Sequence, residues 1–189
     1  IIMNTYVCTT TIPLAVVSLL FSAGADRGKP GSVDSLYRVL NTKEKIWLYE
    51  RNRGNEHHKC LYWLKQDLTE EKYTFTEFYV DSSRMQRTTL SARLSSEDLN
   101  ATLKVRGKSE DGYDITYTLV ESTKDNECFI LYIWPNNQGN WRGRCELFIW
   151  DDALKRNLGE CLYLYTIYCG HRWEIPQVLY DNECPYKYL

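Results

Sequence analysis

The fold is decided by two neighbouring apolar stretches, ECFILYI at residues 127–133 and GRCELFIW at residues 143–150. Both are short, rich in β-branched and aromatic residues, and bounded by turn-forming residues, which is typical of β-strands. Six earlier segments have the same period of two. The eight candidate strands begin near Lys45, His58, Lys72, Met85, Ala101, Tyr113, Glu127 and Gly143.

The connections between these strands favour one topology. Segments 52–55, 81–83, 95–98, 109–112 and 135–140 are rich in Gly, Asn, Asp and Ser, as turns are. No connection is long enough for a crossover helix, so neighbouring strands must pair antiparallel. The sequence therefore predicts an all-β fold, an eight-stranded antiparallel up-and-down barrel. A sandwich is the alternative, and a barrel of this size can hold one small ligand.

Two helices are expected beside the barrel. Ser32 can cap a short helix that ends near residue 40. Apolar residues at helical spacing predict a second helix over residues 151–169, although Gly159 allows it to start only after that residue. This C-terminal helix should pack against the outside of the barrel.

Residues 1–25 have the pattern of a secretory signal peptide. The apolar run 12–21 is too short to span a membrane, and Ala23-Gly24-Ala25 suits signal peptidase. A buried N-terminal helix is the alternative. Removal of the signal takes Cys8 with it and leaves six of the seven cysteines, which predicts three disulfides in a secreted domain over residues 26–189.

The second helix constrains the barrel wall. Cys161 and Cys169 lie about 12 Å apart along a helix, so two disulfides can attach it to the sheet. Cys128 and Cys145 are the obvious partners and would point outward, which turns their strand neighbours inward.

The inward positions include Glu146, and a carboxylate among aromatic residues is costly unless something pairs with it. A register error would instead leave Glu146 in solvent. Trp47 and Tyr117 stand in the middle of their strands and are added to this lining, although alternation does not define which way they face. The predicted ligand-binding residues are Glu146, Phe148, Phe129, Leu131, Tyr117 and Trp47.

Composition and motifs exclude several functions. The 23 Lys and Arg balance 25 Asp and Glu, so bulk positive charge cannot drive nucleic-acid binding. The 6 Trp, 15 Tyr and 5 Phe exceed the usual need of a core and suit a lined cavity. No nucleophile elbow, phosphate loop or zinc motif occurs, so no catalysis, cofactor or metal is expected. The pair His57-His58 is interpreted as solvated surface.

Several ordered markers carry a family resemblance: IWLY at 46–49, DNEC at 125–128, CELF at 145–148 and ECP at 183–185. Between Asp34 and Cys184 the chain resembles the salivary lipocalins of ticks that bind histamine or other biogenic amines. This resemblance implies the disulfides Cys60–Cys184, Cys128–Cys161 and Cys145–Cys169.

The resemblance also implies a protonated amine held by carboxylates and aromatic faces. Glu146 matches one family acid, with Phe148 in the place of a Trp. Other expected acids are replaced by Phe129, Arg53 and Leu90. These losses favour an indole amine such as serotonin, or an eicosanoid or fatty acid. The candidate cations for an acidic lipid are Arg84, Arg87, Arg93 and Arg106.

We therefore expect a secreted, non-enzymatic, monomeric scavenger that binds a small host mediator, such as histamine or serotonin, during blood feeding. An eicosanoid- or fatty-acid-binding lipocalin is one alternative, and a module that binds a host protein through its loops is another. Neither a nucleic acid nor a membrane is an expected partner. Asn100, in the sequon Asn100-Ala101-Thr102, is a predicted glycosylation site.

Overall fold

The structure is a computed structural model that describes residues 31–52, 58–97, 99–109, 112–134, 143–170 and 176–184. The predicted signal peptide at residues 1–25 lies outside these ranges. No helix within them is long and apolar enough to cross a membrane.

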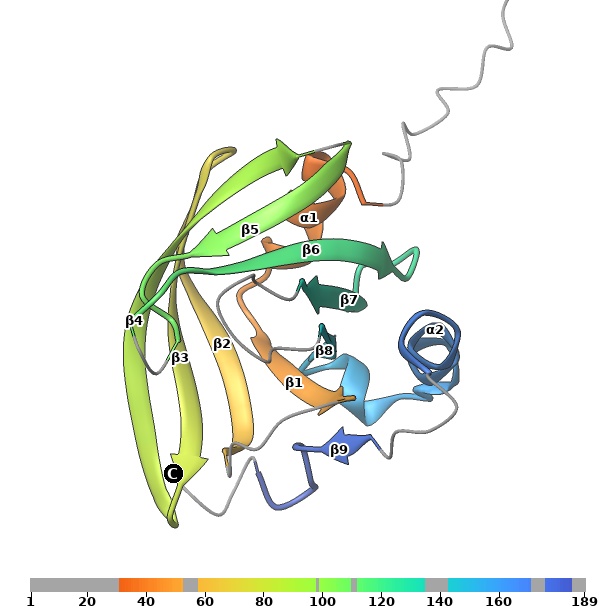
Figure 1. The fold of residues 1–189 in the computed structure, drawn as a ribbon. Helices are drawn as coiled ribbons and strands as arrows, with labels where there is room; N and C mark the ends of the chain where they lie inside the picture. The colour runs from red at the N-terminus through yellow and green to blue at the C-terminus, as the bar shows by residue number, and fades with distance from the viewer. Residues whose placement is uncertain are drawn as a thin grey trace, which may run out of the picture.

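Within the described ranges, eight consecutive strands form a closed antiparallel barrel (Figure 1). Each strand pairs with the next along the chain, β8 pairs with β1, and β1 pairs with β2 to close the sheet. The strands are β1 (Lys45–Arg51), β2 (Lys59–Leu68), β3 (Lys72–Asp81), β4 (Arg84–Glu97), β5 (Asn100–Val105), β6 (Ile115–Ser122), β7 (Cys128–Ile133) and β8 (Arg144–Trp150). The predicted barrel is confirmed, and the sandwich alternative is wrong.

A ninth strand, β9 (Gln177–Val178), was not predicted. β1 pairs with β2 through its first three residues and with β9 through its last two. The next residue, Leu179, donates its amide to the Tyr49 carbonyl at 2.9 Å and accepts from the Cys60 amide at 3.0 Å. The C-terminal segment therefore fills the space where β1 and β2 diverge. A two-residue strand has too little alternation to be predicted from sequence.

Helix α1 (Val33–Leu40) covers one end of the barrel. The Ser32 hydroxyl caps it by accepting the Ser35 amide at 3.1 Å, as the sequence predicts. Leu36, Val39 and Leu40 are fully buried in the same cluster as the inner faces of the strands, and Val33 and Tyr37 are partly buried against it. The indole of Trp150 on β8 donates to the Val39 carbonyl at 3.0 Å and fixes the helix to the wall.

Helix α2 (Gly159–Cys169) packs against the outside of the barrel, beside β7 and β8 (Figure 1). It begins at Gly159, and residues 153–155 form a separate 3₁₀ turn, so the later of the two predicted starts is correct. We call the contact of α2 with β7 and β8 the helix seam. It comprises Cys128, Ile130, Cys145, Leu147 and Ile149 on the wall and Cys161, Tyr165 and Cys169 on the helix.

Three disulfides fix these outer segments. Two of them, Cys128–Cys161 and Cys145–Cys169, tie α2 to β7 and β8. The third, Cys60–Cys184, ties the C-terminal segment to β2. The pairs are those that the family resemblance implies.

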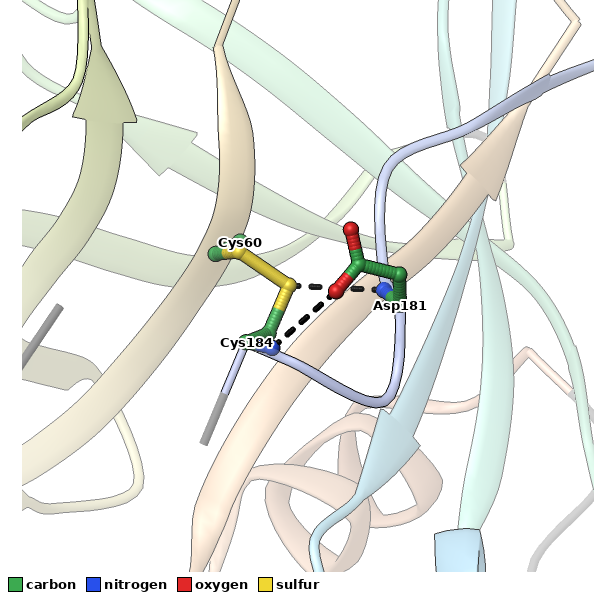
Figure 2. A group of neighbouring side chains, drawn as sticks. All are labelled: Cys60, Asp181 and Cys184. Carbon is green, nitrogen blue, oxygen red and sulfur yellow. Dashed lines mark hydrogen bonds between the residues drawn. A yellow bond between two sulfur atoms is a disulfide. The ribbon is translucent and has the colours of Figure 1, made fainter. Parts of the chain in front are cut away.

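Asp181 lies beside the Cys60–Cys184 disulfide, as Figure 2 shows. Its carboxylate accepts the Cys184 amide at 3.1 Å, and its own amide lies 3.3 Å from the Cys184 sulfur. The ligand atoms of the three residues lie within 4.8 Å of one another. Metals bind the thiolate form of cysteine, which a disulfide cannot supply. The group therefore stabilises a turn and does not form a metal site.

Candidate ligand-binding site in the barrel interior

The inner faces of the strands enclose one apolar cluster, which we call the barrel interior. It takes buried side chains from α1 and from all eight strands β1–β8. Strand alternation places Phe129 and Leu131 of β7 and Phe148 of β8 in it, and Tyr117 of β6 joins them. Each is at most 1% exposed. The structure thus brings these predicted residues together, while their contact with a ligand stays a prediction.

Trp47 is not in the barrel interior, contrary to the prediction. Its neighbours Ile46 and Leu48 face inward, so alternation turns Trp47 to the outside of β1. It packs there with Tyr62 at a ring separation of 4.7 Å and belongs to the cluster around the Cys60–Cys184 disulfide. Its indole donates to the Asp151 carboxylate at 2.7 Å. Trp47 therefore supports the fold.

Trp63 of β2 is fully buried in the barrel interior, and sequence reasoning missed it. Its ring lies 4.5 Å from Phe148, 4.8 Å from Phe75 and 5.7 Å from Tyr117, measured between centroids. Phe129 stacks on Phe148 at 5.5 Å. Such contacts add to the free energy of apolar burial. Residues 60–64 of β2 are all apolar, so the local pattern does not show which face is inside, and the position of Trp63 is set by the closed barrel.

Glu146 faces inward and is 1% exposed, as alternation predicts. The carboxylate has a partner that sequence reasoning did not identify: Arg144 Nε lies 2.7 Å from Glu146 Oε1. Arg51 is paired opposite Glu146 on β1 and is equally buried. Arg51 also donates through Nε to the Gln177 side chain on β9 at 2.8 Å. The Glu146 charge is thus already balanced by the Arg144 guanidinium group, with Arg51 in register on the neighbouring strand.

A bulge explains why the position of Arg51 was missed. The register between β1 and β8 shifts between Leu48 and Glu50. Glu50 therefore stands opposite the outward Leu147, and Arg51 stands opposite the inward Glu146. Simple alternation from Leu48 would have turned Glu50 inward and Arg51 outward.

A second inward carboxylate, Glu77 of β3, was also missed. It follows Tyr73 and Phe75 on the inner face of the same strand. The Trp63 indole donates to Glu77 Oε2 at 2.7 Å. The Lys108 ammonium pairs with the same oxygen, and both charged side chains are 9% exposed. Lys108 Nζ also lies 5.6 Å from the centroid of the Trp63 ring.

Tyr73 places a buried hydroxyl in the barrel interior. The ring stacks on Phe75 at 4.7 Å and is fully buried. Among the residues that the structure describes, the hydroxyl has no hydrogen-bond partner. Burial raises the pKa of this phenol, so the group stays protonated and able to donate. Buried hydroxyls are usually paired, so this one is a candidate contact for a polar group of a ligand.

The remaining predicted positions contribute no charge to the barrel interior or lie outside the described residues. The proposed cations Arg84, Arg87, Arg93 and Arg106 are all exposed. Leu90 is buried inside. Arg53 and His57 fall outside the described residues. Asn100 heads β5 and is exposed, so glycosylation there stays a prediction.

A closed eight-stranded antiparallel barrel with one helix at its end and another outside is the fold of lipocalin-like ligand-binding proteins. The sequence pattern of the tick histamine binding protein family matches residues 25–186, and the chain belongs to that family. A search of curated protein sequences found no match.

Solved structures show the same fold. The AM182 serotonin complex is similar with a TM-score of 0.60 and 20% identity, covering 86% of this chain and 98% of that one. Japanin from Rhipicephalus appendiculatus, bound to cholesterol, has a TM-score of 0.50 and 16% identity over 76% of this chain and 96% of its own. The siderocalin Ex-FABP has a TM-score of 0.54 and 10% identity, covering 74% of this chain and 94% of its own.

Proposed function

We propose that this protein is a secreted, non-enzymatic carrier that binds a small aromatic amine in the barrel interior and sequesters it from a host. The observation that carries the proposal is the presence of two inward carboxylates, Glu77 and Glu146, among stacked aromatic rings. Buried carboxylates are costly unless they are paired, and here Lys108 pairs with Glu77 and Arg144 with Glu146, so an amine would take the place of one of these cations. Membership of the tick histamine binding protein family supports the amine.

The chemistry of the interior suits a flat, protonated ligand. A carboxylate replaces part of the hydration of an ammonium group, and aromatic faces attract it through their quadrupole. The rings of Trp63, Phe148 and Phe129 offer a large apolar surface. An indole amine buries more apolar area than histamine, so we propose serotonin as the better representative. The serotonin complex of the similar AM182 barrel supports this choice.

A second candidate is an amphipathic ligand with an acidic group, such as a fatty acid or eicosanoid. It is favoured by the two buried guanidinium groups, those of Arg51 and Arg144, beside Glu146. Guanidinium groups bind carboxylates in a bidentate manner. In this alternative the acidic group of the ligand would compete with Glu146 for the arginines.

Secretion is part of the proposal. The three disulfides fit an oxidising compartment outside the cell. They also suit a carrier that must stay folded in a host fluid, because each one closes a loop in the unfolded chain.

Isothermal titration calorimetry with serotonin, histamine and arachidonate tests the ligand class. We expect serotonin to bind, histamine to bind more weakly and arachidonate to bind least. Binding of arachidonate with no heat from either amine would overturn the amine in favour of the second candidate.

The variants Glu77→Gln and Glu146→Gln then locate the amine. Loss of a hydrogen bond to a charged group costs about 1.5–3 kcal/mol, so the substitution that weakens serotonin by this amount identifies the counter-charge. If neither variant changes the affinity, the amine does not use a carboxylate of the interior.

A further inference from the structure

We infer that Glu77 and Trp63 form an ammonium-binding subsite, and that Lys108 fills it with its own ammonium group until an amine ligand displaces it. The inference rests on the proposed function, because it specifies where in the barrel interior the amine group binds. It assigns the anchoring role to Glu77, whereas the sequence alone points to Glu146.

The geometry around Glu77 is that of an amine site. A carboxylate and an indole ring are both in position for one cation, and Lys108 Nζ contacts the first and lies 5.6 Å from the centroid of the second. The indole N–H donates to the same oxygen at 2.7 Å and holds the carboxylate in place without neutralising it. A carboxylate with an aromatic face is the combination that binds primary ammonium groups.

Lys108 can leave this site without unfolding the barrel. It lies in the connection between β5 and β6, outside either strand. Described residues of this connection hold one another: the Gly107 amide donates to the Asp114 carboxylate at 3.1 Å, and the Ser109 amide donates to the Tyr113 carbonyl at 3.0 Å. The long side chain of lysine is flexible, so its ammonium group can move to solvent while the backbone stays fixed.

The exchange of Lys108 for a ligand amine keeps the charge balance. Removal of one partner from a buried ion pair is strongly destabilising because the remaining charge is uncompensated. An incoming ammonium group replaces the lysine with a group of the same charge and chemistry, so Glu77 stays paired throughout. A neutral or anionic ligand cannot make this replacement.

The ion pair of Glu146 with Arg144 is less able to exchange its cation for a ligand amine. Arg144 belongs to β8 and is paired through its backbone with Ile133 of β7, so its guanidinium group starts from a fixed strand. Glu146 is also paired opposite Arg51. An amine would have to compete there with a guanidinium group that is held by a strand and can form several hydrogen bonds, whereas at Glu77 it competes with one flexible lysine.

Chemical rescue tests the subsite without knowledge of the natural ligand. Lys108→Ala removes the ammonium group and three methylenes, which together correspond to propylamine. We expect Lys108→Ala to melt at a lower temperature than the wild type and propylamine to raise its melting temperature. Propylamine should leave the wild type nearly unchanged, and 1-propanol, which lacks the charge, should rescue neither.

Lys104 provides a matched control. It lies on the neighbouring strand β5, its side chain is 51% exposed, and its Nζ lies 3.5 Å from Asp114 Oδ2. Lys104→Ala removes the same charge from the same region and should show no rescue by propylamine. The double variant Lys108→Ala/Glu77→Gln should also lose the rescue, because the counter-charge is gone.

Calorimetry with serotonin tests the competition. If Lys108 occupies the subsite more than about nine-tenths of the time, its removal raises the apparent affinity at least about tenfold. Lys108→Gln, which keeps a donor to Glu77 but not the charge, serves if Lys108→Ala does not fold, and the same gain is expected.

The outcomes separate this inference from the proposed function. Serotonin binding with the same affinity in the wild type, Lys108→Gln and Glu77→Gln would overturn the inference and leave an amine carrier. No binding of serotonin or histamine by the wild type or any variant, together with rescue of Lys108→Ala by propylamine, would overturn the proposed function but keep the ammonium subsite. Absence of both would overturn both.

Discussion

The barrel interior and the helix seam are both fully buried, yet they are built differently. The interior combines aromatic rings with charged groups, namely Glu77 with Lys108 and Glu146 with Arg144. The seam combines aliphatic side chains and Tyr165 with two disulfides, and has no ion pair among its residues. Buried ion pairs contribute little net stability, because desolvation offsets their attraction. Disulfides limit the freedom of the unfolded chain and stabilise without any role in binding.

This difference teaches where the protein obtains its stability. A binding interior must keep polar groups that a ligand can use, and such groups lower the free energy of unfolding relative to an apolar core. The seam compensates from outside the barrel, where covalent links do not interfere with a ligand. Substitutions should therefore change binding and stability together in the interior, and stability alone in the seam.

The largest expected effect is that of Phe148→Ala in the barrel interior. The ring is fully buried and contacts both Trp63 and Phe129, so its loss leaves a cavity. We expect the free energy of unfolding to fall by about 3–5 kcal/mol, measured by urea denaturation. Ligand affinity should fall as well. A folded variant that retains full affinity would show that the ligand does not bind in the interior.

The double variant Cys128→Ala/Cys161→Ala should have a smaller effect, confined to stability. The disulfide joins residues separated by 33 positions, and its removal should cost about 2–4 kcal/mol. Calorimetry at a temperature where the variant is folded should give the affinity of the wild type. A change in affinity comparable to that of Phe148→Ala would break the contrast between the two regions.

The two regions also differ in how far the sequence predicts them. The seam follows from helical spacing of Cys161 and Cys169 and from the neighbouring strands, which have regular alternation. The aromatic half of the interior follows from the same alternation, which places Phe129 and Phe148 inside. Local periodicity is therefore enough for the walls of the barrel.

The charged half of the interior could not be predicted this way. Arg51 turns inward because of a bulge, which no local pattern in β1 indicates. Lys108 meets Glu77 from a connection 31 residues away, so their contact depends on the closed barrel. The prediction for Trp47 was wrong for a different reason, because apolar residues stand on both sides of it and the local pattern does not show which face is inside. Long-range partners, unlike period-two faces, are set by tertiary structure.

Glu50, which lies beside the helix seam, makes the stability of the fold depend on pH. It is 8% exposed and stands on the outer face opposite Leu147 of the seam, where burial raises the pKa of its carboxyl. The folded state therefore holds this proton more tightly than the unfolded state, in which the pKa of the Glu50 carboxyl is near 4.5. Below that pH both states are protonated and folding carries no penalty. As the pH rises through the folded pKa, the buried carboxylate must ionise and stability is lost.

The variant Glu50→Gln removes this ionisation. Its free energy of unfolding should be close to that of the wild type at pH 4 and higher than that of the wild type at pH 7. Urea denaturation at both values measures the difference. If the free energy of unfolding depends on pH in the same way in both proteins, the Glu50 carboxyl ionises without cost. The affinity of the variant for its ligand at pH 7 should equal that of the wild type.

The smallest expected effect comes from removing one oxygen atom in each region. Tyr73 in the interior and Tyr165 in the seam both bury a hydroxyl that finds no hydrogen-bond partner in the described part of the chain. A buried group of this kind opposes folding, so Tyr73→Phe and Tyr165→Phe should each raise stability by about 1 kcal/mol or less. Binding should separate them: if the Tyr73 hydroxyl contacts a polar group of the ligand, Tyr73→Phe lowers affinity while it stabilises the fold. Tyr165→Phe should stabilise without any change in affinity. Thermal melts and calorimetry on the two variants measure both quantities, and equal affinities would remove the Tyr73 hydroxyl from the binding site.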